Sequence, residues 1–163
     1  MRKTLFYALC AGLLLASGAQ AVETANKPVV DDSALPRLGK VWRETNPYRG
    51  EAAAFDIGRS AYNQTCARCH GADAATNAAP APDLRNLDRG CRRIQNPLTK
   101  EHCMADNDAY FAKTVQNGKV IVGITHMPPW RDALSQEQAW AIQVFIEGQA
   151  KAAAAKARAG AGK

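Results

Sequence analysis

The chain contains the stretch Cys66-Ala67-Arg68-Cys69-His70, a Cys-x-x-Cys-His motif. This spacing is typical of a c-type haem attachment site, in which two thiols add to the two vinyl groups of one porphyrin. The adjacent His lies close enough to bind the iron from one face. A thioredoxin-like dithiol uses the same spacing but expects a βαβ context, which the surrounding sequence lacks. A zinc site needs two further ligands, which Cys91 and Cys103 could supply by count. We interpret the motif as haem attachment.

The N-terminus has the pattern of an export signal. Arg2 and Lys3 form a positive region, and 5–16 is an apolar stretch too short to span a bilayer comfortably. Ala19-Gln20-Ala21 is a small-x-small cleavage site. We predict a signal peptide over 1–21, cleaved after Ala21, that takes Cys10 with it; an uncleaved anchor is the alternative. The mature protein is then expected in the periplasm, without stable membrane insertion.

Four cysteines, an even number, remain after the predicted signal peptide is removed. With Cys66 and Cys69 committed to the haem, Cys91 and Cys103 are left in an oxidising compartment, where they are expected to form a disulfide. Two free thiols are the alternative. The loop that this disulfide closes is short, so its stabilisation is about 3 kcal/mol by the chain-entropy relation.

Charge is unevenly distributed along the chain. Residues 22–148 hold 15 basic and 15 acidic side chains, and the tail after them holds only basic ones. The high pI therefore does not indicate nucleic-acid binding, and no basic stretch is interleaved with aromatics. The length allows one domain. We divide the chain into a signal (1–21), a lead-in (22–50), a haem domain (51–148) and a basic Ala/Lys-rich tail (149–163), and expect a monomer.

Three helices are predicted from apolar periodicity and end signals. They cover 51–65, 107–117 and 135–148. The second is expected to begin at a cap formed by Asp106 or Asn107 and to end at Gly118. The third begins with a capping-box pattern, Ser135-Gln136-Glu137-Gln138.

Outside these helices the sequence is mostly irregular. The stretch 120–124 is the single strand candidate, and a long loop rich in Ala, Pro, Asn and Asp separates the haem motif from the second helix. A loop of that length needs a structural reason. Wrapping a haem edge, with a staple between Cys91 and Cys103, would supply one.

The iron needs either a second protein ligand or an open site. Met127 is the preferred candidate, because it lies in a loop before the third helix and is followed by Pro128 and Pro129, which stiffen it. His126, Met104 and His102 are the other donors, and an open site is the remaining alternative. A His/Met ligand pair raises the haem potential and suits electron transfer.

These residues together resemble the class I c-type cytochromes over 51–148. The matching elements, in order, are Gly58, Tyr62, the motif Cys66-Ala67-Arg68-Cys69-His70-Gly71, Pro82-Asp83-Leu84, Val115-Gln116-Asn117-Gly118, Met127-Pro128-Pro129-Trp130 and Trp140. The resemblance implies an all-α fold with three to five short helices around one covalent haem c, and first and last helices that cross near a Gly and an aromatic. It also implies that the carbonyl of Pro82 accepts a hydrogen bond from His70 Nδ1, and that Leu84 packs on the haem.

A narrower resemblance covers the lead-in as well. The stretches 42–50, 57–64 and 83–94, with the Cys91–Cys103 insertion, are similar to soluble periplasmic cytochromes that accept electrons from PQQ-dependent (quinoprotein) alcohol dehydrogenases, especially the ethanol dehydrogenase type. This implies a dehydrogenase as electron donor and a later cytochrome or terminal oxidase as acceptor.

The expected function is therefore one-electron transfer and not catalysis. Two alternatives are a haem enzyme, such as a peroxidase or a subunit of a sulfur or nitrogen oxidoreductase, and a haem-based gas sensor. Both need an open or displaceable iron ligand. Carbon monoxide binding by the ferrous protein discriminates them from a simple carrier.

Overall fold

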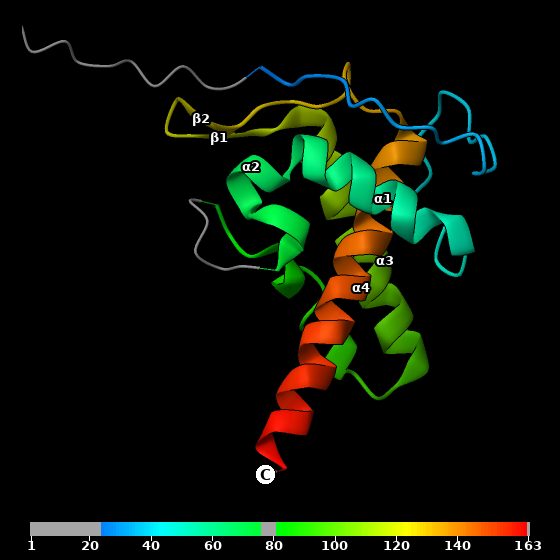
Figure 1. Ribbon diagram of the computed structural model, residues 1–163, viewed down its shortest axis with the longest axis vertical. Coiled ribbons are helices and arrows are strands. Elements are labelled where there is room, and N and C mark those ends of the chain that lie inside the picture. The colour runs from blue at the N-terminus through cyan, green and yellow to red at the C-terminus, as the bar shows by residue number, and fades with distance from the viewer. Residues whose placement is uncertain (1–23, 76–80, 163) are drawn as a thin grey trace, which may run out of the picture.

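The computed structural model describes residues 24–75 and 81–162. The predicted signal peptide, with Cys10, lies outside these residues. In chain order, the elements are α1 (Ala52–Thr65), α2 (Ala67–His70), η1 (Ala72–Ala74), η2 (Leu84–Asn86), η3 (Cys91–Arg93), α3 (Pro97–Asn117), β1 (Lys119–Ile121), β2 (Ile124–Met127) and α4 (Gln136–Ala161), where η marks a 3₁₀ helix. Figure 1 shows α1 crossing α4, with α3 beside α4.

The crossing of α1 and α4 forms the centre of the core. A Cβ atom placed on Gly58 would lie 2.0 Å from the carbonyl oxygen of Ala141, so glycine is what lets the two backbones meet there. Beside this contact, the rings of Tyr62 and Phe145 have centroids 5.2 Å apart. The expected crossing of the first and last helices near a Gly and an aromatic is confirmed.

The second predicted helix is correct in its end but wrong in its start. α3 ends at the Gly118 cap, as expected, yet it begins at Pro97, ten residues before the predicted start. The side chain of Asn96 accepts a hydrogen bond from the Thr99 N–H, and proline is well suited to a first helical turn. The preceding loop is correspondingly shorter, and Cys103 lies on a helix.

The third predicted helix extends further than expected. Ser135 forms the predicted capping box with Gln138, and α4 then continues past Gly148 to Ala161. Gly148 lies inside the helix, opposite the ring of Phe55, which an added Cβ would meet at 2.5 Å. The Ala/Lys-rich tail is helical as far as Ala161, because alanine favours helix strongly. With 21 residues in α3 and 26 in α4, these two helices are also longer than the short ones expected.

The strand candidate 120–124 is wrong in detail. The structure has a two-stranded antiparallel hairpin in which Ile121 pairs with Ile124. Residues Val122 and Gly123 form its turn, with φ of 50° and 76°. A turn with positive φ at both central residues interrupts what the sequence presents as one continuous apolar run. The hairpin is the one departure from an all-α fold within the described residues.

The lead-in packs on the domain through Trp42 and Tyr48. The ring of Trp42 lies 5.9 Å from that of Trp140, and Tyr48 is 1% exposed. Arg49 follows and pairs with Asp108 of α3 and Glu147 of α4, whose side chains are 0% and 7% exposed. The lead-in therefore joins the two long helices through a charge cluster that the sequence did not reveal.

Within the described residues, no helix has the length and apolar character needed to cross a membrane.

Candidate haem-binding site

The two thiols of the motif lie where α1 ends and α2 begins. Cys66 and Cys69 are both unpaired, the first half-buried and the second exposed. Residues three apart share one side of a helical turn, so both thiols can face one group. Burial raises the pKa of the Cys66 thiol to about 11, which keeps it protonated at neutral pH. A redox dithiol instead needs a lowered pKa, so this environment disfavours the thioredoxin-like alternative.

His70 is oriented by the chain that returns past it. Its Nδ1 atom lies 2.7 Å from the carbonyl oxygen of Pro82. A carbonyl only accepts hydrogen bonds, so Nδ1 carries the proton and the lone pair is left on Nε2. This is the contact that the family resemblance implies, and it prepares Nε2 to bind a metal.

The turn after His70 is held by residues that the sequence analysis did not single out as a group. The hydroxyl of Tyr62 donates to the carbonyl oxygen of Gly71 at 3.0 Å. Asp73, in the left-handed region at φ 54°, accepts at Oδ1 from Arg59 Nε and Asn63 Nδ2. These side chains tie the segment behind His70 to α1. Asn63 and Arg59 lie at helical spacing on α1, but their shared partner Asp73 becomes evident only when the turn is folded.

Met127 is the last residue of β2 and is half-buried. It lies at the end of a strand, where the sequence predicted a loop. A Cβ atom on Gly118 would lie 2.3 Å from the Met127 carbonyl oxygen, so the start of the Met-Pro-Pro segment passes directly over the end of α3. The segment is held again where the Trp130 N–H donates to the carbonyl of Val115 at 2.8 Å. Two backbone contacts with α3 thus fix the chain on either side of the prolines.

The other candidate iron ligands lie on α3 and on β2. His102 and Met104 are on α3, His102 exposed and Met104 half-buried. His126 is exposed on β2, beside the half-buried Met127. These placements favour Met127.

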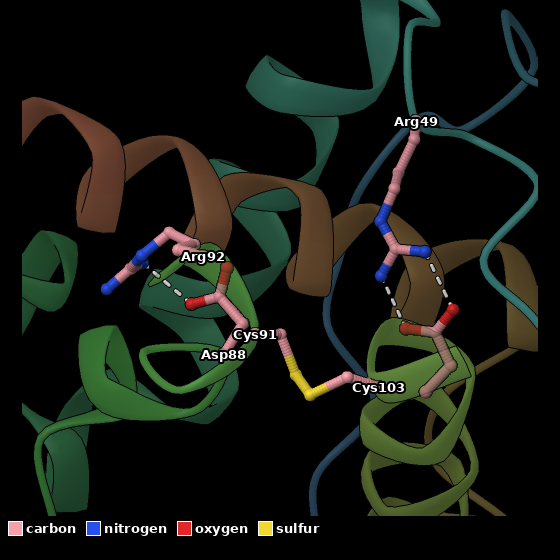
Figure 2. The surroundings of a disulfide bond; sticks show 6 residues. Arg49, Asp88, Cys91, Arg92 and Cys103 are labelled. Carbon is pink, nitrogen blue, oxygen red and sulfur yellow. Dashed lines mark hydrogen bonds and ion pairs between the residues drawn. A yellow bond between two sulfur atoms is a disulfide. The ribbon is translucent and has the colours of Figure 1, made fainter. Parts of the chain in front are cut away.

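The disulfide prediction is confirmed. Cys91 and Cys103 are bonded, with a Cα–Cα distance of 5.5 Å, and join η3 to α3. Figure 2 shows the Asp88–Arg92 ion pair on the η3 side of this bond. Because both cysteines are used, they cannot complete a zinc site with the motif. No group of three or more His, Cys, Asp and Glu suited to a metal occurs in 24–75 and 81–162.

The donor set therefore suits a c-type haem. It comprises the unpaired thiols of Cys66 and Cys69, the imidazole of His70, whose Nδ1 proton is donated to Pro82, and the thioether of Met127 on a fixed segment. Leu84 is partly buried against the hydrophobic core on the same returning chain as Pro82. These residues are the ones that would hold the group; their roles stay predictions.

Comparison with known proteins agrees with this site. Residues 53–146 match the family model described as "Cytochrome C oxidase, cbb3-type, subunit III". The chain therefore belongs to the cytochrome c family, whose members carry covalently bound haem c. It is also similar to cytochrome c550 of Pseudomonas aeruginosa, at 43% identity over 141 residues, which cover 84% of this chain and 87% of that protein. No solved structure matches the chain. Family and relative together indicate an electron-transfer protein and not an enzyme.

Proposed function

We propose that the chain is a periplasmic one-electron carrier that receives electrons from a PQQ-dependent alcohol dehydrogenase. Cys66 and Cys69 would hold one haem c, with His70 and Met127 as its two protein ligands. The bound haem supplies one-electron chemistry between its ferric and ferrous states. The acceptor would be a later cytochrome or a terminal oxidase.

One observation carries the proposal most directly. His70 is fixed at Nδ1 by Pro82, and Met127 lies on a segment that is held on both sides by α3. Two positioned protein ligands would leave no vacant position for a substrate, which is the condition for simple electron transfer. Enzyme and sensor functions need that position to be free or easily freed.

The location and the donor have separate support. The Cys91–Cys103 disulfide suits an oxidising compartment, in agreement with the predicted signal peptide. The donor assignment depends on the narrower resemblance, whose lead-in stretch 42–50 is a packed part of this molecule through Trp42, Tyr48 and Arg49. Within the described residues, that stretch has a structural role whether or not it also contacts the donor.

The ligand assignment is tested by Met127→Ala. Loss of the thioether should lower the haem potential, because a Met ligand raises it. It should also allow the ferrous protein to bind carbon monoxide at neutral pH, because the coordination position that Met127 would fill becomes vacant. Redox titration and absorption spectra measure both effects. Met104→Ala is the control, with no change in either. A Met127→Ala protein with the potential and spectrum of the wild type would show that the ligand is another residue.

The donor assignment is tested by stopped-flow haem reduction. Oxidised protein is mixed with a PQQ-dependent ethanol dehydrogenase and ethanol, at low and high salt. Rapid, saturable reduction that outpaces a mitochondrial-type cytochrome is expected. Reduction no faster than that control would contradict the dehydrogenase as donor and leave the haem site unaffected.

A further inference from the structure

The carbonyl of Pro82, which accepts the His70 proton, has little local support of its own. The hydrogen bond from His70 Nδ1 to this oxygen is 2.7 Å long and lies at the exposed surface, where water competes for the same carbonyl. Proline has no N–H that could tie its own residue to the fold. Before Pro82, the chain is held where the Ala81 N–H donates to the carbonyl oxygen of Cys69 at 3.0 Å. The direction of the Pro82 carbonyl therefore depends on what holds the chain after it.

Asp83 holds that side, because the Pro82 carbonyl belongs to the planar peptide unit that links the two residues. Asp83 caps η2, and its Oδ1 accepts a hydrogen bond from the Arg85 N–H at 2.9 Å. The Arg85 guanidinium donates to both carboxylate oxygens, from Nε to Oδ1 at 2.9 Å and from Nη2 to Oδ2 at 2.8 Å. These bonds lower the pKa of the Asp83 carboxyl, so the pair stays charged at neutral pH. A bidentate contact of this kind fixes direction as well as distance.

Arg85 also connects this segment to its neighbours. Its Nη1 donates to the carbonyl oxygen of Ala75 at 3.1 Å, and its own carbonyl oxygen accepts from Arg92 Nη2 at 3.1 Å. Arg92 in turn pairs with Asp88 beside the Cys91–Cys103 disulfide, as Figure 2 shows. Arg85 thus joins the turn that follows the haem motif to the disulfide-bonded loop.

The Arg85–Asp83 pair does more than cap a short helix. Capping η2 requires only the Asp83 carboxylate and the Arg85 N–H. Here the two side chains are only 20% and 15% exposed, and the guanidinium donates from Nε, Nη1 and Nη2. A guanidinium engaged at all of its nitrogens has a fixed orientation, unlike that of an exposed surface pair.

We propose that Arg85 is a positioning residue for His70: by holding Asp83, it fixes the Pro82 carbonyl that accepts the His70 Nδ1 proton. This inference rests on the proposed function, in which His70 is an iron ligand. A hydrogen bond from the outer nitrogen of a ligating imidazole fixes the ring and makes the other nitrogen a more basic ligand. A more basic ligand favours the ferric state. Arg85 therefore keeps the haem potential below the value that a loosely held His70 would give.

The test uses Arg85→Lys and Arg85→Gln in the haem-loaded protein. Arg85→Lys keeps the charge but replaces the planar fork by a single point donor, which cannot reproduce the contacts with Asp83 and Ala75 together. Arg37→Gln is the matched control, because the Arg37 side chain is 60% exposed in its ion pair in the lead-in.

The direct measurement is solvent exchange of the His70 Nδ1 proton, followed by NMR of the ferrous protein. The chain has three histidines, so ¹⁵N-histidine labelling gives few signals, and His102 and His126 serve as internal references. Exchange at His70 should be about tenfold faster in Arg85→Gln, with Arg85→Lys between it and the wild type. A redox titration of Arg85→Lys should show a raised potential although the net charge is unchanged. Arg37→Gln should match the wild type in both measurements.

Three results would overturn the positioning role and leave the His70 ligand assignment intact. One is wild-type exchange and potential in both Arg85 variants. Another is a lowered potential in Arg85→Gln with unchanged exchange, because loss of a nearby cation alone favours the ferric state. The third is faster exchange at His70 with equally faster exchange of the backbone amides of α1 and α4, which would show a general loss of stability. If wild-type spectra show that His70 is not bound to the iron, the ligand assignment fails first, and the role of Arg85 fails with it.

Discussion

At the scale of single residues, Gly58 decides how closely α1 and α4 approach. Gly58→Ala places a Cβ atom 2.0 Å from the Ala141 carbonyl oxygen, and backbone cannot yield as a flexible side chain does. We expect a loss of about 1–3 kcal/mol or more in the free energy of unfolding, measured by urea titration. Gly160→Ala is the control, because Gly160 is also helical and has nothing within 4 Å of an added Cβ. Equal effects of the two substitutions would contradict the close contact.

Tyr48 makes the free energy of unfolding fall as the pH becomes alkaline. Burial, with nearby Glu137 adding to it, raises the pKa of this phenol from 10.0 to about 12, and its hydroxyl donates to the Pro36 carbonyl. The unfolded chain loses this proton at lower pH than the folded one. The stabilisation is therefore complete below pH 10 and is lost as pH rises towards 12.

Urea titrations from pH 8 to 11 measure how the free energy of unfolding declines with pH. Tyr48→Phe should make this decline shallower, because the variant has no phenol proton to lose at this position. Tyr110→Phe is the control because Tyr110 is 48% exposed. The same decline in wild type and Tyr48→Phe would show that another group causes it.

At the scale of elements, the Cys91–Cys103 disulfide holds η3 against α3. The two cysteines are 12 residues apart, and the chain-entropy relation gives about 3 kcal/mol for a loop of this size. Replacing both by Ala should lower the free energy of unfolding by that amount and make the protein insensitive to reductant. Urea titration with and without reductant measures both. A wild type that is equally stable in reductant would contradict a stabilising role.

At the scale of the whole molecule, Arg49 links three separate parts of the chain. Its guanidinium donates to Asp108 Oδ2 at 2.7 Å and to Glu147 Oε1 at 2.6 Å. Burial by itself would lower the pKa of Arg49, but the hydrogen bonds that it donates to both carboxylates raise this pKa above its usual value, so its charge is permanent. Arg49→Met would leave two buried carboxylates without their cation, which costs about 3–5 kcal/mol.

Urea titration of Arg49→Met measures this loss, and adding Asp108→Asn should recover part of it. Arg37→Met is the matched control, because the Arg37 side chain in its ion pair with Asp32 is 60% exposed. A much smaller loss is expected there. Similar losses for the two arginines would mean that the lead-in is not anchored by this cluster.

The sequence by itself determined the haem motif, the cap at Ser135, the end of α3 at Gly118 and the pairing of Cys91 with Cys103. Each is a local pattern, or follows from counting the cysteines that remain. The early start of α3 was also present in the sequence, as Asn96 before Pro97, and was missed because the irregular composition around it hid the signal.

Only the tertiary structure decided three other features. The cluster around Arg49 joins residues 59 and 98 positions apart, and such contacts leave no periodicity in the sequence. The turn at Val122 contradicts the preference of valine, so local propensity predicted a strand through it. The contact of His70 with Pro82 was implied by family resemblance alone, because it depends on the path of the chain that returns between them. Long-range contacts depend on how the elements pack, and local sequence patterns do not encode that packing.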